Sequence, residues 1–299
     1  MNRSRWKNVL PRAWASLRAF ARQPSATPPA AAPPQLGVAL GGGFARGLAH
    51  LGVLKALEKE KIPVGYLAGT SIGSLLAGAY AAGTPLEEIA AVARTVRWKD
   101  FGRWTLSRMG LASNERLEEL VRRTFRATCF EDLKIPLAVV ATDLQQARPV
   151  VFTTGELAPA IRASCAYPGL FLPVAYDGGW LVDGGLVSEV PVRALKSLGA
   201  EVVLAVALQN LQPGQQVRSV VDVLGRAFSI AQQAAEPVWR EEADLVVEPE
   251  VSEFAWDDFE RADELIAAGE RAMRGKLPRL RALLQPTAAP AAARPAAAT

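Results

Sequence analysis

Short apolar runs alternate along the chain with longer stretches in which apolar residues recur every three or four positions. Runs of this length are typical of buried strands, and the longer stretches have the periodicity of amphipathic helices. The expected strands are LGVALGG, VGYLAGTS, LAVVATDL, VVLAVAL and DLVVEPE, and the expected helices cover 45–60, 72–82, 113–126, 191–198, 217–240 and 258–284. This alternation predicts an α/β domain with a mostly parallel central sheet and helices on both faces.

Two further segments predict short antiparallel or edge strands, PVVFTTGEL and VAYDGGWLVDGG. In the second segment, Asp177-Gly178 is a favoured two-residue hairpin turn. The segment 62–86 has no charged residue over 25 positions, a length that can span a bilayer. Its five glycines and two prolines divide it into a strand, a turn and a helix, so we predict a buried core segment.

The two ends of the chain differ in composition from the body. Residues 1–24 carry six basic and no acidic side chains. Their large apolar residues recur on one helical face: Trp6, Leu10, Trp14, Leu17 and Phe20. We predict a basic amphipathic segment here, either an interfacial helix on an anionic membrane or a solvated tail. A Pro/Ala linker at 25–35, a single domain at 36–285 and a disordered Ala/Pro tail at 286–299 complete the predicted organisation.

Charge and cysteine content narrow the possible classes of protein. The net charge of +4 belongs to the N-terminal segment, because removing its six basic residues leaves 28 basic against 30 acidic residues. The body therefore lacks the charge of a nucleic-acid-binding domain. Cys129 and Cys165 cannot by themselves form a disulfide framework or a zinc site, and we expect no cofactor. No apolar core of signal-peptide length follows the basic residues, so we expect a cytoplasmic or peripheral inner-membrane protein.

Gly69-Thr70-Ser71-Ile72-Gly73 matches the pattern G-x-S-x-G, with a predicted strand before it and a predicted helix after it. A sharp strand-to-helix turn holds the serine in a strained backbone conformation. It also sets the hydroxyl at a helix N-terminus, which favours a developing negative charge. The pentapeptide alone leaves two interpretations of Ser71: a nucleophile, or a small residue that fills a tight turn.

Gly41-Gly42-Gly43 follows the first predicted strand and precedes a predicted helix. A glycine-rich turn of this kind presents backbone N–H groups to an anion. In acyl transfer that anion is the tetrahedral oxyanion, and each donor is worth about 2.7–4 kcal/mol. The spacing does not match a dinucleotide loop, because Arg46 stands where a third glycine is required. Arg46 is expected to brace the loop, form a structural ion pair or meet a lipid phosphate.

The single histidine, His50, precedes Ser71, whereas ordinary G-x-S-x-G hydrolases place their histidine after the nucleophile. We therefore expect His50 to pack beside the glycine loop and look for another base. Asp177 and Asp183 each precede two glycines. Asp177 fits the hairpin turn, whereas Asp183 ends a predicted strand, where a carboxylate can point into a crevice. Asp183 is the candidate base, and partial desolvation would make it a stronger one.

Taken in order, GGGFARG, GTSIG and the DGG at 183–185 resemble the bacterial patatin-like phospholipase family, including the neuropathy-target-esterase-type catalytic domain. AIRASCAYPGLFLPV and GLASNERLEEL also resemble family segments, and the resemblance covers nearly all of 36–275. It implies a three-layer α/β/α sandwich, a Ser71–Asp183 dyad, an oxyanion hole from Gly41, Gly42 and Gly43, and no metal. The implied activity is hydrolysis of fatty-acyl esters of phospholipids or lysophospholipids through an acyl-enzyme.

Two other functions fit the same motifs. One is an acyltransferase of the same fold, and the other is a catalytically idle membrane-docking regulatory protein. The segment at 97–111, RWKDFGRWTLSRMGL, interleaves bulky apolar and basic residues. This pattern is typical of a lid or acyl-entry rim that rests on anionic lipid, although ordinary core packing also fits it.

Overall fold

The computed structural model describes residues 35–208 and 216–285. The amphipathic segment predicted at 1–24, nearly all of the linker at 25–35 and the tail at 286–299 lie outside the described residues, so those predictions stay predictions. The described residues belong to one compact unit.

One sheet joins eight strands of the described chain in the order β10-β9-β1-β2-β5-β8-β7, with β6 paired to β5. Its strands are β1 (Leu36–Leu40), β2 (Tyr66–Thr70), β5 (Leu137–Asp143), β6 (Arg148–Phe152), β7 (Val174–Tyr176), β8 (Gly179–Asp183), β9 (Val202–Val206) and β10 (Leu245–Val247). Neighbours from β10 to β5 run parallel, whereas β6, β7 and β8 pair antiparallel. The mostly parallel sheet predicted from the sequence is confirmed.

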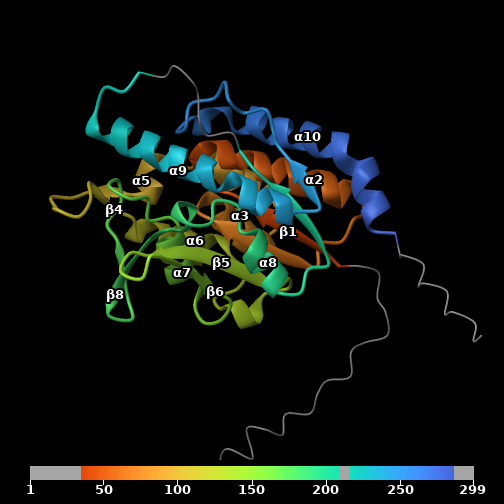
Figure 1. Ribbon diagram of the computed structural model, residues 1–299, viewed down its shortest axis with the longest axis horizontal. Helices are drawn as coiled ribbons and strands as arrows, with labels where there is room; N and C mark the ends of the chain where they lie inside the picture. The colour runs from red at the N-terminus through yellow and green to blue at the C-terminus, as the bar shows by residue number, and fades with distance from the viewer. Residues whose placement is uncertain (1–34, 209–215, 286–299) are drawn as a thin grey trace, which may run out of the picture. The chain divides into compact units, whose positions relative to one another are not determined.

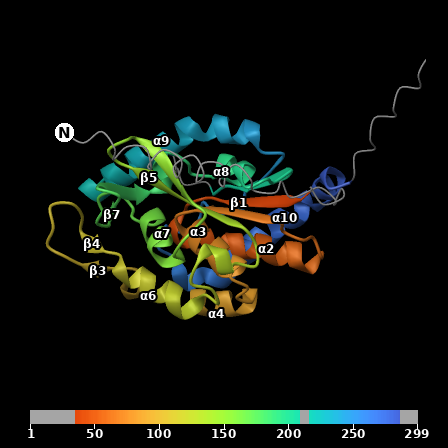
Figure 2. The ribbon, with the colours of Figure 1, turned by 90° about the horizontal axis from the view of Figure 1, so that it is seen from below.

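Helices cover both faces of this sheet, as Figures 1 and 2 show. The α-helices are α2 (Ala49–Lys59), α3 (Ile72–Ala81), α4 (Leu86–Thr95), α5 (Trp98–Phe101), α6 (Glu115–Thr124), α7 (Leu157–Ser164), α8 (Val192–Ser197), α9 (Val220–Glu242) and α10 (Ala262–Leu283). Short 3₁₀ turns lie at Phe44–Leu48, Phe130–Asp132, Gly184–Leu186 and Phe259–Arg261, and a separate small sheet pairs β3 (Arg103–Trp104) with β4 (Ala112–Ser113). In Figure 2, α8 and α9 lie on one side of the sheet and α2, α3 and α10 on the other. The predicted three-layer α/β/α sandwich is confirmed.

The two faces of the sheet have different cores. In β1, Val38 and Leu40 belong to the large core shared with α2, α3 and α10, whereas Ala39 belongs to the core beneath α8. A strand buried on both faces reads as a continuous apolar run, which is why LGVALGG signals a strand without alternation. The α8 side is tight, because a β-carbon on Gly37 would lie 2.5 Å from the β-carbon of Ala200.

Strand β5 brings the ends of β2 and β8 together. Val140 of β5 pairs with Thr70 of β2, and Ala141 pairs with Asp183 of β8, both on the edge of β5 opposite β6. Strands β2 and β8 therefore run toward one another along one edge of β5 and end at adjacent positions. Because Ser71 directly follows Thr70, the strand register itself places Ser71 near Asp183.

The hairpin predicted around Asp177-Gly178 is also confirmed. Strands β7 and β8 pair antiparallel, and the turn residues have positive φ values of 45° for Asp177 and 75° for Gly178. Two consecutive positive φ angles are what a tight hairpin turn of type I′ requires. Asp177 is exposed at this turn, away from the end of β8 that carries Asp183.

Helices α4, α5 and α7 and the β3–β4 sheet were not expected from the sequence. On α4, Leu86, Ile89, Ala90 and Ala93 are buried at the spacing of an amphipathic helix, so a signal was present. The apolar segment 62–86 contains β2 and α3, as predicted. Within the described residues, no helix is both long and apolar enough to cross a membrane.

Candidate active site

Ser71 occupies the sharp turn between β2 and α3, in a backbone conformation that is unfavourable for a residue with a side chain (φ 55°, ψ −129°). Both flanking glycines are required by their surroundings. A β-carbon on Gly69 would lie 2.4 Å from the Cα of Ser74, and one on Gly73 would lie 2.2 Å from the carbonyl oxygen of Leu40. The strained turn expected from G-x-S-x-G is therefore present, and the glycines make room for it.

Hydrogen bonds hold the backbone of Ser71 on both sides. Its N–H donates to Oγ of Ser164 at 2.9 Å, and the Ser164 hydroxyl donates to the carbonyl of Val140 at 2.6 Å. The hydroxyl of Ser74 donates to the Ser71 carbonyl at 2.6 Å. These contacts fix the turn against β5 and α3. The role of Ser164 was missed from the sequence, because it depends on a contact between segments far apart in the chain.

Asp183 ends β8 as a buried carboxylate with only 2% of its surface exposed. Its Oδ1 accepts the Gly185 N–H at 2.8 Å, whereas Oδ2 is buried and accepts no hydrogen bond from the described residues. Burial raises the pKa of Asp183 to about 7, although the Ser71 hydroxyl and the Gly185 N–H oppose the rise. A pKa near neutrality is the property that a general base needs.

The glycine loop lies directly beside Ser71, since a β-carbon on Gly42 would lie 3.6 Å from the β-carbon of Ser71. The N–H groups of Gly41 and Gly42 donate to the carbonyls of Val206 at 3.1 Å and Glu189 at 3.3 Å. Gly43, with φ at 145°, makes no such bond among the described residues. In this conformation it is therefore the N–H of Gly43 that is open to an anion.

His50 and Arg46 form hydrogen bonds that hold the glycine loop in place. His50 is fully buried and donates from Nε2 to the carbonyl of Gly41 at 2.9 Å. Burial lowers the pKa of His50 to about 4, so the ring is neutral near pH 7. Arg46, also buried, donates from Nε to the carbonyl of Phe254 at 2.9 Å, and burial lowers its pKa. His50 thus lies where the sequence predicted, and Arg46 ties the loop to the segment before α10.

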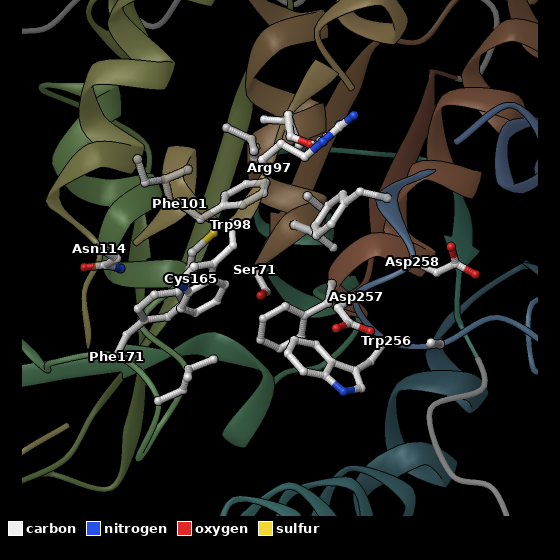
Figure 3. A pocket seen from close by; sticks show the side chains of 18 of the residues that line it. Ser71, Arg97, Trp98, Phe101, Asn114, Cys165, Phe171, Trp256, Asp257 and Asp258 are labelled. Carbon is white, nitrogen blue, oxygen red and sulfur yellow. Dashed lines mark hydrogen bonds between the residues drawn. The ribbon is translucent and has the colours of Figure 1, made fainter. Parts of the chain in front are cut away.

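Two cavities meet at Ser71. The larger has a volume of about 650 Å³ and a mainly apolar lining, which includes Leu75, Trp98, Phe101 and Leu117. Figure 3 shows Ser71 at its centre, with Trp98, Phe101 and Phe171 to one side and Trp256 and Asp257 to the other. The smaller cavity, of about 250 Å³, adjoins the glycine loop, Asp183 and α9. Four residues line both cavities: Phe44, Ser71, Leu170 and Trp256.

The described residues contain no set of side chains arranged to bind a metal ion. Among residues 35–208 and 216–285, no group of three or more His, Cys, Asp and Glu side chains is arranged to hold a metal ion. Both cysteines are free, and Cys165 lines the larger cavity near Ser71. Burial raises the pKa of the Cys165 thiol, which keeps it protonated and weakly nucleophilic near pH 7.

Comparisons with known proteins identify relatives of this chain. An uncharacterized NTE family protein of Mycobacterium tuberculosis is 36% identical over 184 residues, covering 60% of this chain and 51% of that protein. Lysophospholipase NTE1 of Mycosarcoma maydis is 36% identical over 184 residues, covering 59% of this chain and 10% of that protein. The chain thus spans about half the length of the mycobacterial relative and a tenth of the fungal one.

Among solved structures, the crystal structure of VipD from Legionella pneumophila matches with a TM-score of 0.60 and 13% sequence identity, over 84% of this chain and 67% of that chain. At this identity the likeness concerns the fold. The family model for patatin-like phospholipases matches residues 38–196, a span of 159 of the 299 residues. This span includes the glycine loop, the turn at Ser71 and the end of β8 at Asp183. The chain belongs to the patatin-like phospholipase family.

Proposed function

We propose that this protein is a serine acyl-hydrolase that cleaves fatty-acyl esters of phospholipids or lysophospholipids through a Ser71–Asp183 dyad. One observation carries the proposal: a strained serine at the head of α3 lies next to a buried carboxylate whose Oδ2 has no hydrogen-bond partner among the described residues. A structural aspartate at this depth is normally paired. An unpaired one with a raised pKa is suited to take and return a proton.

In the first half of the reaction, Oδ2 of Asp183 takes the proton from the Ser71 hydroxyl as Oγ attacks the ester carbonyl carbon. The carbonyl oxygen becomes an oxyanion, for which the open N–H of Gly43 is a suitable donor in the loop. The dipole of α3 adds favourable potential at the same place. As the tetrahedral centre collapses, the bond to the alcohol breaks and Asp183 returns the proton to the departing oxygen.

Water completes the cycle. Asp183 takes a proton from a water molecule, whose oxygen attacks the acyl-enzyme carbonyl, and Ser71 regains a proton as the fatty acid leaves. Gly41 and Gly42, expected as further oxyanion donors, have N–H groups that already bond to Val206 and Glu189. We assign them the role of shaping the loop, with Gly43 as the donor.

Fatty-acyl esters are the substrate class that the site favours. The larger cavity offers an apolar lining to a long hydrocarbon chain. One relative carries the name lysophospholipase, which supports lipid esters with a single acyl chain as substrates. Arg46 donates a hydrogen bond to the carbonyl of Phe254 and also lines the smaller cavity. Its position along this cavity is the one observation that supports a contact with a lipid phosphate.

A peripheral contact with an anionic membrane belongs to the same proposal. The 103–113 hairpin, which contains β3 and β4, exposes Trp104, Leu106 and Met109 to solvent. Arg103 and Arg108 on this hairpin are exposed and form no ion pair with any described residue. Trp104 also lines the larger cavity. An apolar rim with unpaired cations suits a surface from which lipid enters.

Labelling with a fluorophosphonate probe, followed by hydrolysis of a lysophospholipid, tests the proposal. Ser71→Ala should abolish labelling, and Asp183→Asn should lower it by at least about a hundredfold, because general-base catalysis contributes about 10²–10⁴. His50→Gln, which keeps a donor for the Gly41 carbonyl, should label and turn over within about tenfold of the native protein.

Full labelling of Asp183→Asn together with loss in His50→Gln would overturn the dyad. A folded native protein that neither labels nor hydrolyses would favour the idle membrane-docking function. Labelling with transfer of the acyl chain to an added alcohol in preference to water would identify an acyltransferase.

A further inference from the structure

The two cavities at Ser71 differ in which of the proposed catalytic groups line them. Asp183, Gly42 and Gly43 line the smaller cavity and not the larger one. Ser71 lines both, so the tetrahedral centre formed on its Oγ lies at the junction. The three other substituents of that centre are the oxyanion, the departing alcohol and the acyl chain.

The reaction steps require each of these three substituents to point into a particular cavity. The departing oxygen must lie within reach of Asp183, because that residue returns the proton to it, and the oxyanion must lie near the loop N–H of Gly43. Both groups line the smaller cavity. The acyl chain is left with the larger cavity, whose lining of Leu75, Phe101 and Leu117 suits hydrocarbon.

A buried polar side chain in the smaller cavity has no role in the steps above. Gln232 of α9 is 6% exposed and lines this cavity. Its side-chain amide makes no hydrogen bond with any described residue. A β-carbon on Gly185 would lie 2.7 Å from Nε2 of Gln232 and 3.1 Å from Oδ1 of Asp183, so the amide and the carboxylate lie side by side around that glycine.

The amide is open to the cavity and bonds to no described residue, so a ligand there can form hydrogen bonds with it, each worth about 0.5–1.5 kcal/mol. A side-chain amide both donates and accepts, so a hydroxyl group is a matching partner. Its position beside Asp183 is where the part of the substrate next to the departing oxygen must lie.

We propose that the smaller cavity binds the alcohol half of the substrate, a polyol of the glycerol type, and that Gln232 recognises it through a hydroxyl or ester oxygen adjacent to the departing oxygen. The larger cavity binds the acyl chain. This assignment rests on the proposed function, and it adds Gln232 as a specificity-determining residue for the leaving group.

Two palmitoyl esters that differ in the alcohol test this assignment: 1-palmitoylglycerol, whose alcohol has free hydroxyls, and p-nitrophenyl palmitate, whose alcohol has none. Gln232→Leu should lower kcat/KM for the glycerol ester about tenfold and for the p-nitrophenyl ester less than threefold. Gln232→Met, a second variant without donors, should act alike. Gln233→Leu is the matched control, because the next residue of α9 is exposed and should leave both esters unchanged.

The larger cavity is tested with Ala255→Trp, because Ala255 is exposed and lines this cavity. This variant should reduce kcat/KM for palmitoyl esters of both alcohols more than tenfold relative to butyryl esters. The cavity assignment would be overturned, with the proposed function left standing, by either of two results. One is an equal loss on the glycerol and p-nitrophenyl esters in Gln232→Leu, and the other is an unchanged chain-length profile in Ala255→Trp. A native protein that hydrolyses none of these esters would overturn the proposed function and this assignment with it.

Discussion

Replacing Asp183 by asparagine should lower activity at least about a hundredfold and, at alkaline pH, increase stability. The folded pKa of about 7 lies far above the ordinary value of 3.8 because the carboxyl group is buried. Between these two values the folded protein binds more protons than the unfolded chain, so its free energy of unfolding falls as pH rises. Proton linkage gives a loss of about 2–3 kcal/mol between pH 5 and pH 8 from Asp183 alone.

Asparagine does not titrate, so the variant lacks this loss, while its Oδ1 can still accept the Gly185 N–H. Urea unfolding of both proteins at pH 5 and pH 8, followed by tryptophan fluorescence, measures the effect. The stability of the variant relative to the native protein should rise by about 2–3 kcal/mol across this interval. Other titrating groups are common to both proteins and cancel in this comparison.

A relative stability that stays constant between pH 5 and pH 8 would refute the raised pKa of Asp183. Activity provides the second measurement. Because Asp183 must be ionised to act as a base, kcat/KM of the native protein should rise with pH around a midpoint near 7. A midpoint near pH 4 would show that the carboxyl group titrates like an exposed one.

Four other substitutions lead to distinct expectations. Trp104→Ala should lower hydrolysis of anionic vesicles at least about fivefold, since burying a large apolar side chain is worth more than 1 kcal/mol, and equal loss on a soluble short-chain ester would rule out the rim. Gly269→Ala should destabilise the protein by about 3 kcal/mol, because its β-carbon would lie 1.8 Å from the Ala49 carbonyl oxygen. Gly275→Ala on the same helix meets nothing within 4 Å and should stabilise by about 1 kcal/mol, and urea unfolding measures both. Ser164→Ala should cost about 1–3 kcal/mol and lower kcat, whereas unchanged stability and kcat would mean that this hydroxyl does not hold the turn.

Local features of the fold were predictable because they depend on neighbouring residues. The strained turn at Ser71 requires small residues around it, and the sequence supplies Gly69 and Gly73 at those positions. The hairpin turn requires positive φ angles, which Asp177-Gly178 adopts readily. Helix α4 shows that a periodic signal can also be overlooked, since its buried positions follow the ordinary amphipathic spacing.

The sequence by itself determined the alternation of strands and helices, the turn that carries Ser71 and the selection of Asp183 over Asp177 as candidate base. These follow from side-chain periodicity and backbone preferences, which act over a few residues. Only the tertiary structure decided which loop N–H stays open, because the acceptors of Gly41 and Gly42 come from distant segments. The placement of Gln232 beside Asp183 was decided in the same way, since the packing of α9 on the sheet, and no local pattern, brings the two side chains together.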